Sequence, residues 1–157
     1  MKSMWWTACI PMMSPRGTDM VLLLCAVPLV WAAITDYRKR IIPDWTWIAI
    51  LLIGIASAFL FPYPAPAQRI AGFLLPGLCL LLLVMKYGGV GGGDIKLTAA
   101  MGFCFGLSAL AAILFFALPP ACIYAAATKQ RSVPLAIFLC IGFIIYAGVF
   151  IYIRAIG

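Results

Sequence analysis

Long apolar runs, separated by short polar or glycine- and proline-rich turns, dominate this chain. Each run approaches the roughly 20 residues that a helix needs to cross a ~30 Å hydrocarbon layer. The pattern therefore predicts membrane-spanning helices. We expect them at residues 20–34, 45–61, 70–85, 97–127 and 135–153.

The run 97–127 is too long for one crossing. Its 31 residues would extend about 46 Å as a helix that rises about 1.5 Å per residue. We expect two short spans here, with a break at Gly106-Leu107-Ser108. The sequence thus predicts an all-α bundle of about six transmembrane helices, forming one domain over residues 1–157. Residues 1–17 are expected to be an interfacial tail, anchored by Trp5 and Trp6.

Composition and charge agree with a membrane protein. The chain is 66% hydrophobic and 10% charged, with a mean hydropathy of +1.15. With six spans, the loops after spans one, three and five share one side and contain most of the basic residues: Arg38, Lys39, Arg40, Lys86, Lys96, Lys129 and Arg131. Basic loops are usually cytoplasmic, so both termini and Arg69 are expected on the other side. The net charge of +7 then reflects topology and anionic lipids, and not nucleic-acid binding.

The acidic residues are all aspartates, and the chain has neither Glu nor His. They are Asp19, Asp36, Asp44 and Asp94. Without His, Ser-His-Asp and Cys-His catalysis, His-ligated metals and imidazole proton relays are excluded. The cysteines form no C-x-x-C pair, so no metal site is predicted, and they are expected to be small buried hydrophobes, with a disulfide as the alternative. They are Cys9, Cys25, Cys79, Cys104, Cys122 and Cys140.

Asp36 and Asp94 are predicted at the same membrane face, at the end of the first span and the start of the fourth. Charged groups beside apolar segments are costly and usually functional. Two carboxyls held close together share a proton, so one can activate a water while the other donates to a carbonyl oxygen, as in an aspartyl protease. Alternatively, each caps a helix or neutralises a basic residue. Capping is favoured for Asp44, which follows Pro43 at a helix start, and Asp19 is expected to be an interfacial charge.

The stretch GGVGGGDIK at 88–96 places glycines directly before Asp94. Because Gly91, Gly92 and Gly93 lack a Cβ, an extended substrate backbone could come close to this aspartate. The spacing fits neither a P-loop nor a dinucleotide fingerprint. A loop without catalytic meaning remains the alternative. Lys96 either favours the ionised form of Asp94 or extends to lipid headgroups.

These motifs resemble those of the type IV prepilin peptidases, a branch of the intramembrane GxGD aspartyl proteases. GGGD at 91–94 resembles the G-x-G-D signature. DYRKRIIPD at 36–44 resembles the family's other motif, an aspartate followed by basic residues and Ile-Pro-Asn. A weaker match is KQRSVP at 129–134 with Leu139 and Gly142, similar to the last cytoplasmic turn and final helix.

The resemblance implies a membrane aspartyl endopeptidase with Asp36 and Asp94 as its catalytic pair. Such enzymes remove the short basic leader of type IV prepilins or pseudopilins at the cytoplasmic face of the bacterial inner membrane, without a cofactor. The cut follows a glycine at the start of the substrate's hydrophobic helix. Substrate contacts would come from Gly91, Gly92, Gly93, Lys96, Arg38, Pro43 and Asp44. Because the loops here are positive, apolar contact with the substrate helix is expected to dominate recognition.

Three features depart from the family pattern. Asp44 stands where asparagine is usual, and Phe138 stands where many relatives have proline. The insert with two C-x-x-C pairs, found in long bifunctional members, is absent, so the chain looks like the short peptidase-only form found with tight-adherence or Flp-type pili, and no methyltransferase activity is predicted. The alternatives are an archaeal preflagellin peptidase, a transporter or channel that binds a cation or protons, and an inert subunit of a secretion assembly.

Overall fold

The structure is a computed structural model that describes residues 15–61, 64–87, 91–128 and 134–156. Within these ranges it contains helices and no strand, as the sequence predicts. The helices are α1 (Pro15–Lys39), α2 (Asp44–Leu60), α3 (Pro66–Tyr87), α4 (Gly92–Thr128) and α5 (Leu135–Ile156). All except α2 contain a segment long and apolar enough to cross a membrane, and α2 is a shorter apolar helix.

Two expectations about helix starts need correction. α1 already begins at Pro15 and α3 at Pro66, several residues before the predicted spans. Proline lacks only a backbone donor, which the first turn of a helix does not use, so proline-rich turns can continue directly into helices. Of the expected interfacial tail, residues 15–17 are helical, and residues 1–14 with Trp5 and Trp6 lie outside the described residues.

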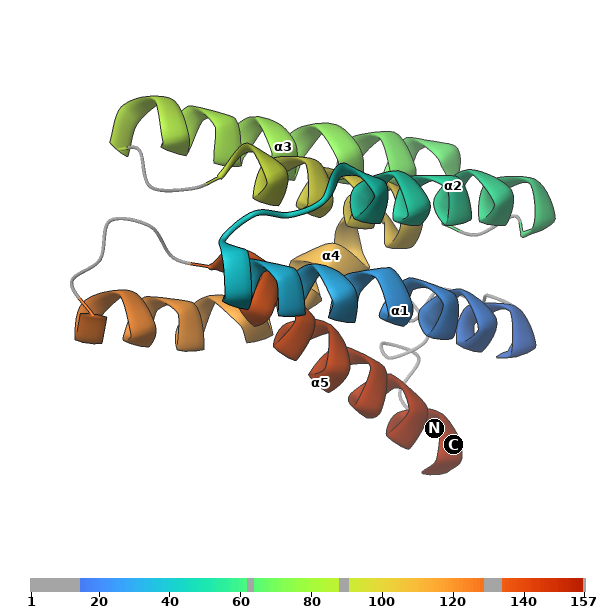
Figure 1. Cartoon of the computed structure of the whole chain (residues 1–157). Helices are drawn as coiled ribbons and strands as arrows, with labels where there is room; N and C mark the ends of the chain where they lie inside the picture. The colour runs from blue at the N-terminus through green and yellow to red at the C-terminus, as the bar shows by residue number, and fades with distance from the viewer. Residues whose placement is uncertain (1–14, 62–63, 88–90, 129–133, 157) are drawn as a thin grey trace, which may run out of the picture.

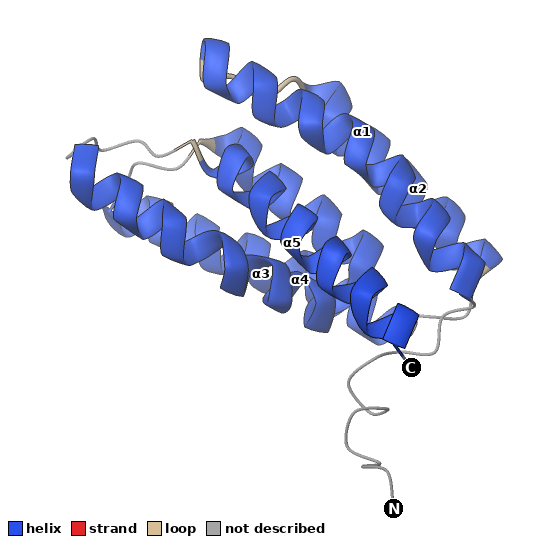
Figure 2. Cartoon of the chain, turned by 90° about the horizontal axis from the view of Figure 1, so that it is seen from below, coloured by secondary structure: helices blue, strands red, loops and turns tan. Residues whose placement is uncertain are grey.

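The helices run alternately up and down the bundle. The end of α1, the start of α2, the end of α3, and the starts of α4 and α5 lie toward one end, which we call the aspartate end because it holds Asp36, Asp44 and Asp94 (Figure 1). The start of α1 and the end of α5 lie toward the opposite end (Figures 1 and 2). Successive connections therefore lie at alternate ends of the bundle, as the sequence predicts.

Gly106 breaks α4 into two segments. Its φ of 82° and ψ of 167° are not helical, and this region of conformations is open essentially only to glycine. The second segment returns to the aspartate end (Figure 1). The predicted break is therefore confirmed, and with two segments in α4 the number of helical segments agrees with the roughly six that the sequence predicts.

Close packing of α3 on α4 depends on two glycines. A Cβ added at Gly72 would collide with the carbonyl of Gly102, and a Cβ at Gly102 with the carbonyl of Gly72. Small residues of this kind let helix backbones touch inside membranes. α4 also contacts α2 and α5, while α1 contacts α2 and α5. The first segment of α4 is thus fixed on several sides, which holds Asp94 in place.

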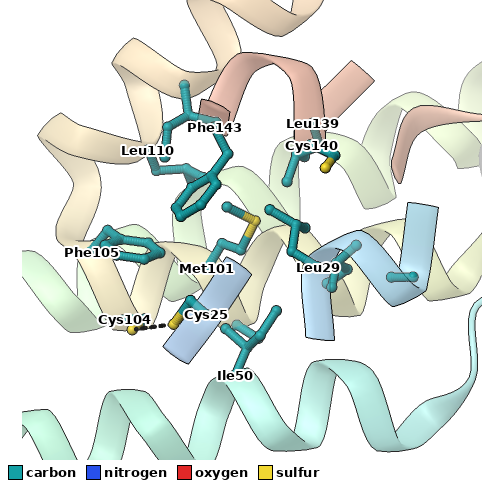
Figure 3. Close-up of a cluster of buried hydrophobic side chains, with 14 of the residues drawn as sticks. Cys25, Leu29, Ile50, Met101, Cys104, Phe105, Leu110, Leu139, Cys140 and Phe143 are labelled. Atoms are coloured by element: carbon teal, nitrogen blue, oxygen red, sulfur yellow. Dashed lines mark hydrogen bonds between the residues drawn. The ribbon is translucent and has the colours of Figure 1, made fainter. Parts of the chain in front are cut away.

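The buried core lies between α1, α4 and α5, with Ile50 contributed by α2 (Figure 3). Its fully buried side chains include Leu29, Met101, Leu110 and Leu139. Toward its edge the sulfur atoms of Cys25 and Cys104 lie 3.5 Å apart, linking α1 to the first segment of α4. The core therefore joins the two helices that carry Asp36 and Asp94.

The cysteines are only partly as expected. Cys25, Cys104 and Cys140 are buried and all described cysteines are free thiols, but Cys79 and Cys122 are exposed on the bundle surface. The prediction of burial is wrong for these two, because the surface of a membrane bundle faces lipid and accepts a small apolar side chain as readily as the core does. Cys9 lies outside the described residues.

Arg69 is buried at the opposite end of the bundle. The sequence pattern places it in a loop, yet it lies in α3 with only 3% of its side chain exposed. Its guanidinium donates hydrogen bonds to Pro64 O (3.0 Å), Gly54 O (3.1 Å), Ser57 Oγ (3.0 Å), Phe103 O (3.5 Å) and Cys104 O (3.4 Å). These acceptors lie in α2, in the turn just before α3 and in the α4 segment that ends at Gly106.

Candidate active site

Asp36 lies in the last turn of α1 and is buried, with 5% of its surface exposed. A carboxylate is disfavoured at this end of a helix, where the backbone carbonyls carry partial negative charge. The helix ends because Arg40 adopts a left-handed conformation with φ of 52°, while its N–H still bonds Asp36 O at 2.9 Å. The charge of Arg40 also acts on the Asp36 carboxyl. The turn that ends α1 therefore places a cation beside the buried aspartate.

Asp94 lies in the first turn of α4 and is equally buried, with 5% exposed. Its N–H bonds Gly91 O at 3.1 Å, and the Gly91 N–H in turn donates to the Asp94 side chain. This exchange resembles a capping box, in which the third helical residue reaches back to the residue before the helix. Thr98 Oγ1 also donates to Asp94 O at 2.8 Å. Local contacts thus fix both the backbone and the side chain of Asp94.

The first turn of α5 brings the two carboxyls together. The backbone N–H of Ala136 hydrogen bonds with both Asp36 and Asp94, and the two carboxyls interact electrostatically with each other. In the first turn of a helix an N–H has no intrahelical acceptor, and the helix start carries partial positive charge. α5 thus supplies a donor to the pair, directly after Pro134.

Each aspartate keeps one oxygen without a protein partner. Among the described residues, Asp36 Oδ2 and Asp94 Oδ1 are buried and accept no hydrogen bond. Buried polar atoms are nearly always paired, so such atoms mark strain or a site for water or substrate. The described residues therefore form a buried two-carboxyl centre with one oxygen of each carboxyl available to a ligand.

The three glycines before α4 differ in their surroundings. A Cβ at Gly93 would lie 2.9 Å from the Cβ of Ile42, so this glycine lets the 40–43 connection pack against the start of α4. Gly92 is exposed, with no atom within 4 Å of an added Cβ, and at Gly91 the nearest atom would be Asp94 Oδ2 at 3.5 Å. The prediction of close substrate approach therefore applies to Gly91 and Gly92, while the missing side chain of Gly93 accommodates Ile42.

Comparison with known sequences assigns the chain to a protein family. Residues 23–149, which include both buried aspartates and Ala136, match the type IV leader peptidase family. The chain belongs to this family. No solved structure matches the chain.

The relatives include both prepilin and preflagellin enzymes. The prepilin leader peptidase/N-methyltransferase of Bacillus subtilis (strain 168) is 34% identical over 119 residues, covering 69% of this chain and 47% of the relative. The preflagellin peptidase of Methanococcus maripaludis is 31% identical over 86 residues (51% and 36%). The prepilin peptidase EppA of Methanocaldococcus jannaschii is 36% identical over 88 residues (55% and 24%). The matched regions thus span about half or less of each of these relatives.

In this leader peptidase chain Asp44 is not a helix cap, contrary to the expectation. The N-cap position of α2 belongs to Pro43, which makes no side-chain cap bond, and Asp44 is the first helical residue. Pro43 is extended, with ψ of 137°, and takes the capping position, so the helix begins one residue earlier than it would if Asp44 were the cap. Asp44 Oδ1 instead accepts hydrogen bonds from Trp47 Nε1 at 2.9 Å and Lys96 Nζ at 3.3 Å.

Lys96 therefore pairs with Asp44, and this contact matches neither alternative considered for it from the sequence. Its ammonium group also lies 5.4 Å from the centre of the Trp47 ring. Arg38 is exposed, and the basic residue that acts on Asp36 is Arg40. The substrate-contact role predicted for Arg38, Pro43 and Lys96 remains a prediction.

Sequence reasoning missed two contributors to the site. Ala136 acts through its backbone, which no motif reveals, although Pro134 before an apolar run signals a helix start nearby. Arg40 acts through its charge, which a left-handed backbone conformation, uncommon outside glycine, places near Asp36. The sequence shows this basic residue but not the turn that positions it.

Proposed function

We propose that this chain is an aspartyl endopeptidase that removes the leader of a type IV prepilin or prepilin-like protein. The observation that carries the proposal is the buried pair of Asp36 and Asp94, with one unpartnered oxygen on each carboxyl. Membership of the leader peptidase family supports proteolysis, and the names of the relatives support this substrate class.

The chemistry follows from two carboxyls that share one proton. The ionised carboxyl takes a proton from a water molecule, whose oxygen attacks the carbonyl carbon of the scissile bond, while the protonated carboxyl donates to the carbonyl oxygen. The tetrahedral intermediate then loses its C–N bond: the departing amine receives a proton from one carboxyl, and a hydroxyl of the intermediate returns its proton to the other, which yields the acid product and restores the singly protonated pair. Ala136 N–H holds both carboxyls in register during these transfers.

We further propose that the aspartate end faces the cytoplasm in a bacterial inner membrane. Exposed basic residues gather at this end: Arg38, Lys39, Arg40, Lys86 and Lys96. Such residues are retained on the cytoplasmic side during insertion. The leader of a newly made prepilin would then meet the two aspartates before the substrate leaves the membrane.

Cleavage of a model prepilin tests the proposal. The substrate carries a basic leader, a glycine and an apolar helix, and is co-expressed with the wild type, Asp36→Asn, Asp94→Asn or Asp19→Asn. We expect loss of the leader with the wild type and with Asp19→Asn, which changes an aspartate far from the pair, and no cleavage with the other two. Mass spectrometry of the substrate reports the cut. Equal processing by all four proteins, or by none, contradicts the proposal.

The preflagellin relative defines a second substrate for the same test. A model preflagellin, with its own leader, is offered in parallel. Faster cleavage of the preflagellin than of the prepilin would support the proposed proteolysis but contradict the prepilin as the preferred substrate. The transporter alternative receives no support from the geometry, because Asp36 and Asp94 lie at one end of the bundle and not near its middle.

A further inference from the structure

An apolar groove of about 410 Å³ lies between α2, α3 and the first segment of α4. Its wall on α3 consists of Phe73, Leu74, Gly77, Leu78 and Leu81, and its other walls of Trp47, Ile95, Lys96 and Ala99. Leu78 and Leu81 are 53% and 45% exposed, so their side chains are open to an incoming apolar surface. The groove reaches the first turns of α4, because Ile95 and Lys96 directly follow Asp94 in that helix.

The end of the groove nearest the site carries a polar rim. Trp47 and Lys96 belong to both the groove and the hydrogen-bonded group that they form with Asp44. The Asp44 and Lys96 side chains are 71% and 53% exposed. Ion pairs this exposed are weak, because water screens both charges, so a competing cation can displace Lys96 at little cost.

Asp44 is distinctive in charge as well as position. Among the described residues it is the one exposed carboxylate at the aspartate end, since Asp36 and Asp94 are buried. The neighbouring exposed residues Arg38, Lys39 and Arg40 are all basic. A cationic peptide approaching this end therefore meets a single complementary group, and it stands at the mouth of the groove beside the Trp47 ring.

Two glycines, Gly91 and Gly92, lie at the start of α4, between the face that lines the groove and the face that carries Asp94. The groove and the aspartate side chains lie on different faces of α4, so a chain must cross the start of that helix to pass between them. Gly92 is exposed, with no atom within 4 Å of an added Cβ, and Gly91 lies next to Asp94 Oδ2. An extended segment crossing these two glycines comes directly beside the Asp94 carboxyl.

We propose that the groove holds the apolar helix of the substrate and that Asp44 exchanges Lys96 for a lysine or arginine next to the scissile bond. The inference rests on the proposed function and names the recognition site for that reaction. Trp47 contributes its ring face to the incoming cation. The groove would fix the helix, the glycines would carry the extended junction to Asp94, and Asp44 would select a basic leader over an acidic one.

Photo-crosslinking locates the substrate without requiring cleavage. Benzoylphenylalanine replaces Leu78 in the groove or, as the matched control, Ile144, an equally apolar and exposed residue on α5. Both variants carry Asp94→Asn and are illuminated in membranes with the model prepilin. We expect crosslinks to the prepilin from position 78 and several-fold fewer from position 144. Equal yields, or crosslinks from position 78 only to lipid or to a second copy of the chain, overturn the proposal.

Kinetics test the cation exchange, because opposite changes are expected on the two sides of one ion pair. Asp44→Asn should raise KM for a lysine-containing leader about two- to fivefold with little change in kcat. Lys96→Gln, which removes the lysine but leaves the hydrogen bond from Trp47, should lower KM. A purely structural role for the pair predicts that both variants impair cleavage equally, and that result would overturn the exchange. Asp19→Asn is the control for the loss of one negative charge.

Charge reversal completes the test. Asp44→Lys should cleave the lysine leader poorly, and a leader with glutamate in place of that lysine should restore cleavage by this variant. If Asp44→Lys fails to cleave the glutamate leader while the wild type cleaves the lysine leader, the cation exchange is contradicted and the proposed function is not. Crosslinks from position 78 without cleavage by any variant would instead support the groove and contradict the protease.

Discussion

The two ends of the bundle each bury charge, but they treat it differently. At the opposite end, the guanidinium of Arg69 makes five hydrogen bonds to four backbone carbonyls and a hydroxyl. At the aspartate end, Asp36 and Asp94 interact with each other and with one shared backbone donor, and each keeps an unpartnered oxygen. Both arrangements carry the cost of removing charge from water.

The difference separates a structural charge from a reactive one. A buried group whose bonding capacity is met holds its surroundings together, as Arg69 holds α2, α3 and α4. A buried group with an oxygen that lacks a hydrogen-bond partner can still bind water or substrate and exchange protons with it. We therefore expect loss of the first to destabilise the fold and loss of the second to abolish reaction while sparing the fold.

The largest effect is expected from Asp94→Asn. Removing a member of the acid–base pair should lower kcat/KM for prepilin cleavage at least about 10³-fold, equivalent to ~4 kcal/mol. The unfolding temperature in detergent should stay equal or rise, because a neutral amide is cheaper to bury than a carboxylate. Parallel cleavage assays and thermal unfolding check both parts, and a strong drop in stability would break the comparison.

The next largest effect is expected from Arg69→Met, which should lower stability and spare activity. Gly54 O and Ser57 Oγ would each lose the guanidinium donor inside the bundle, so the free energy of unfolding should fall by ~3 kcal/mol. The cleavage rate per folded molecule should change little. Lys39→Met, which removes an exposed cation, is the control, and equal losses of stability in the two variants would contradict a structural role for Arg69.

A smaller effect is expected from Ala136→Pro, which deletes the shared donor. Proline is accepted in the first turn of a helix, so α5 should remain helical by circular dichroism. Loss of a hydrogen bond to an ionised group costs ~2 kcal/mol, so kcat should fall about thirtyfold with KM retained. Ala136→Gly keeps the N–H and should keep most activity. If glycine impaired cleavage as much as proline does, the side chain and not the donor would be responsible.

The smallest effect concerns the exposed pair beside the groove. The hydrogen bond from Trp47, followed by the contact with Lys96, lowers the pKa of the Asp44 carboxyl below its ordinary value. The pair is therefore complete above the ordinary pKa of about 3.9 and is lost as the pH falls through the lowered one. A carbon-detected NMR titration should show the Asp44 pKa rising both in Trp47→Phe and in Lys96→Gln. An unchanged titration in both would contradict these contacts.

Much of the fold is readable from the sequence because the membrane restricts it so strongly. Apolar run lengths predict the spans, and the excess length of 97–127 with Gly106 inside it predicts the break that the structure has. The position of Arg69 is not readable in this way. Its acceptors come from α2, α4 and the turn just before α3, and only tertiary packing brings them together.

The candidate site also has parts that the sequence predicts and parts that it does not. Motifs single out Asp36 and Asp94 because carboxylates are rare in apolar sequence, and the structure brings the two together. The Ala136 donor and the left-handed turn at Arg40 belong to the backbone, so side-chain patterns do not encode them. Asp44 is not the predicted cap, because Pro43 takes the N-cap position, and its contact with Lys96, 52 positions away, is beyond the reach of local sequence rules.

The break at Gly106 also decides at which end of the bundle α5 begins. With α4 folded back on itself, an even number of helical segments separates the end of α1 from the start of α5. Were α4 one continuous rod, that number would be odd and α5 would begin at the far surface, carrying the Ala136 amide a full membrane thickness from the carboxyls. A single residue without a side chain, remote from the chemistry, thus decides whether three distant parts of the sequence can meet at all.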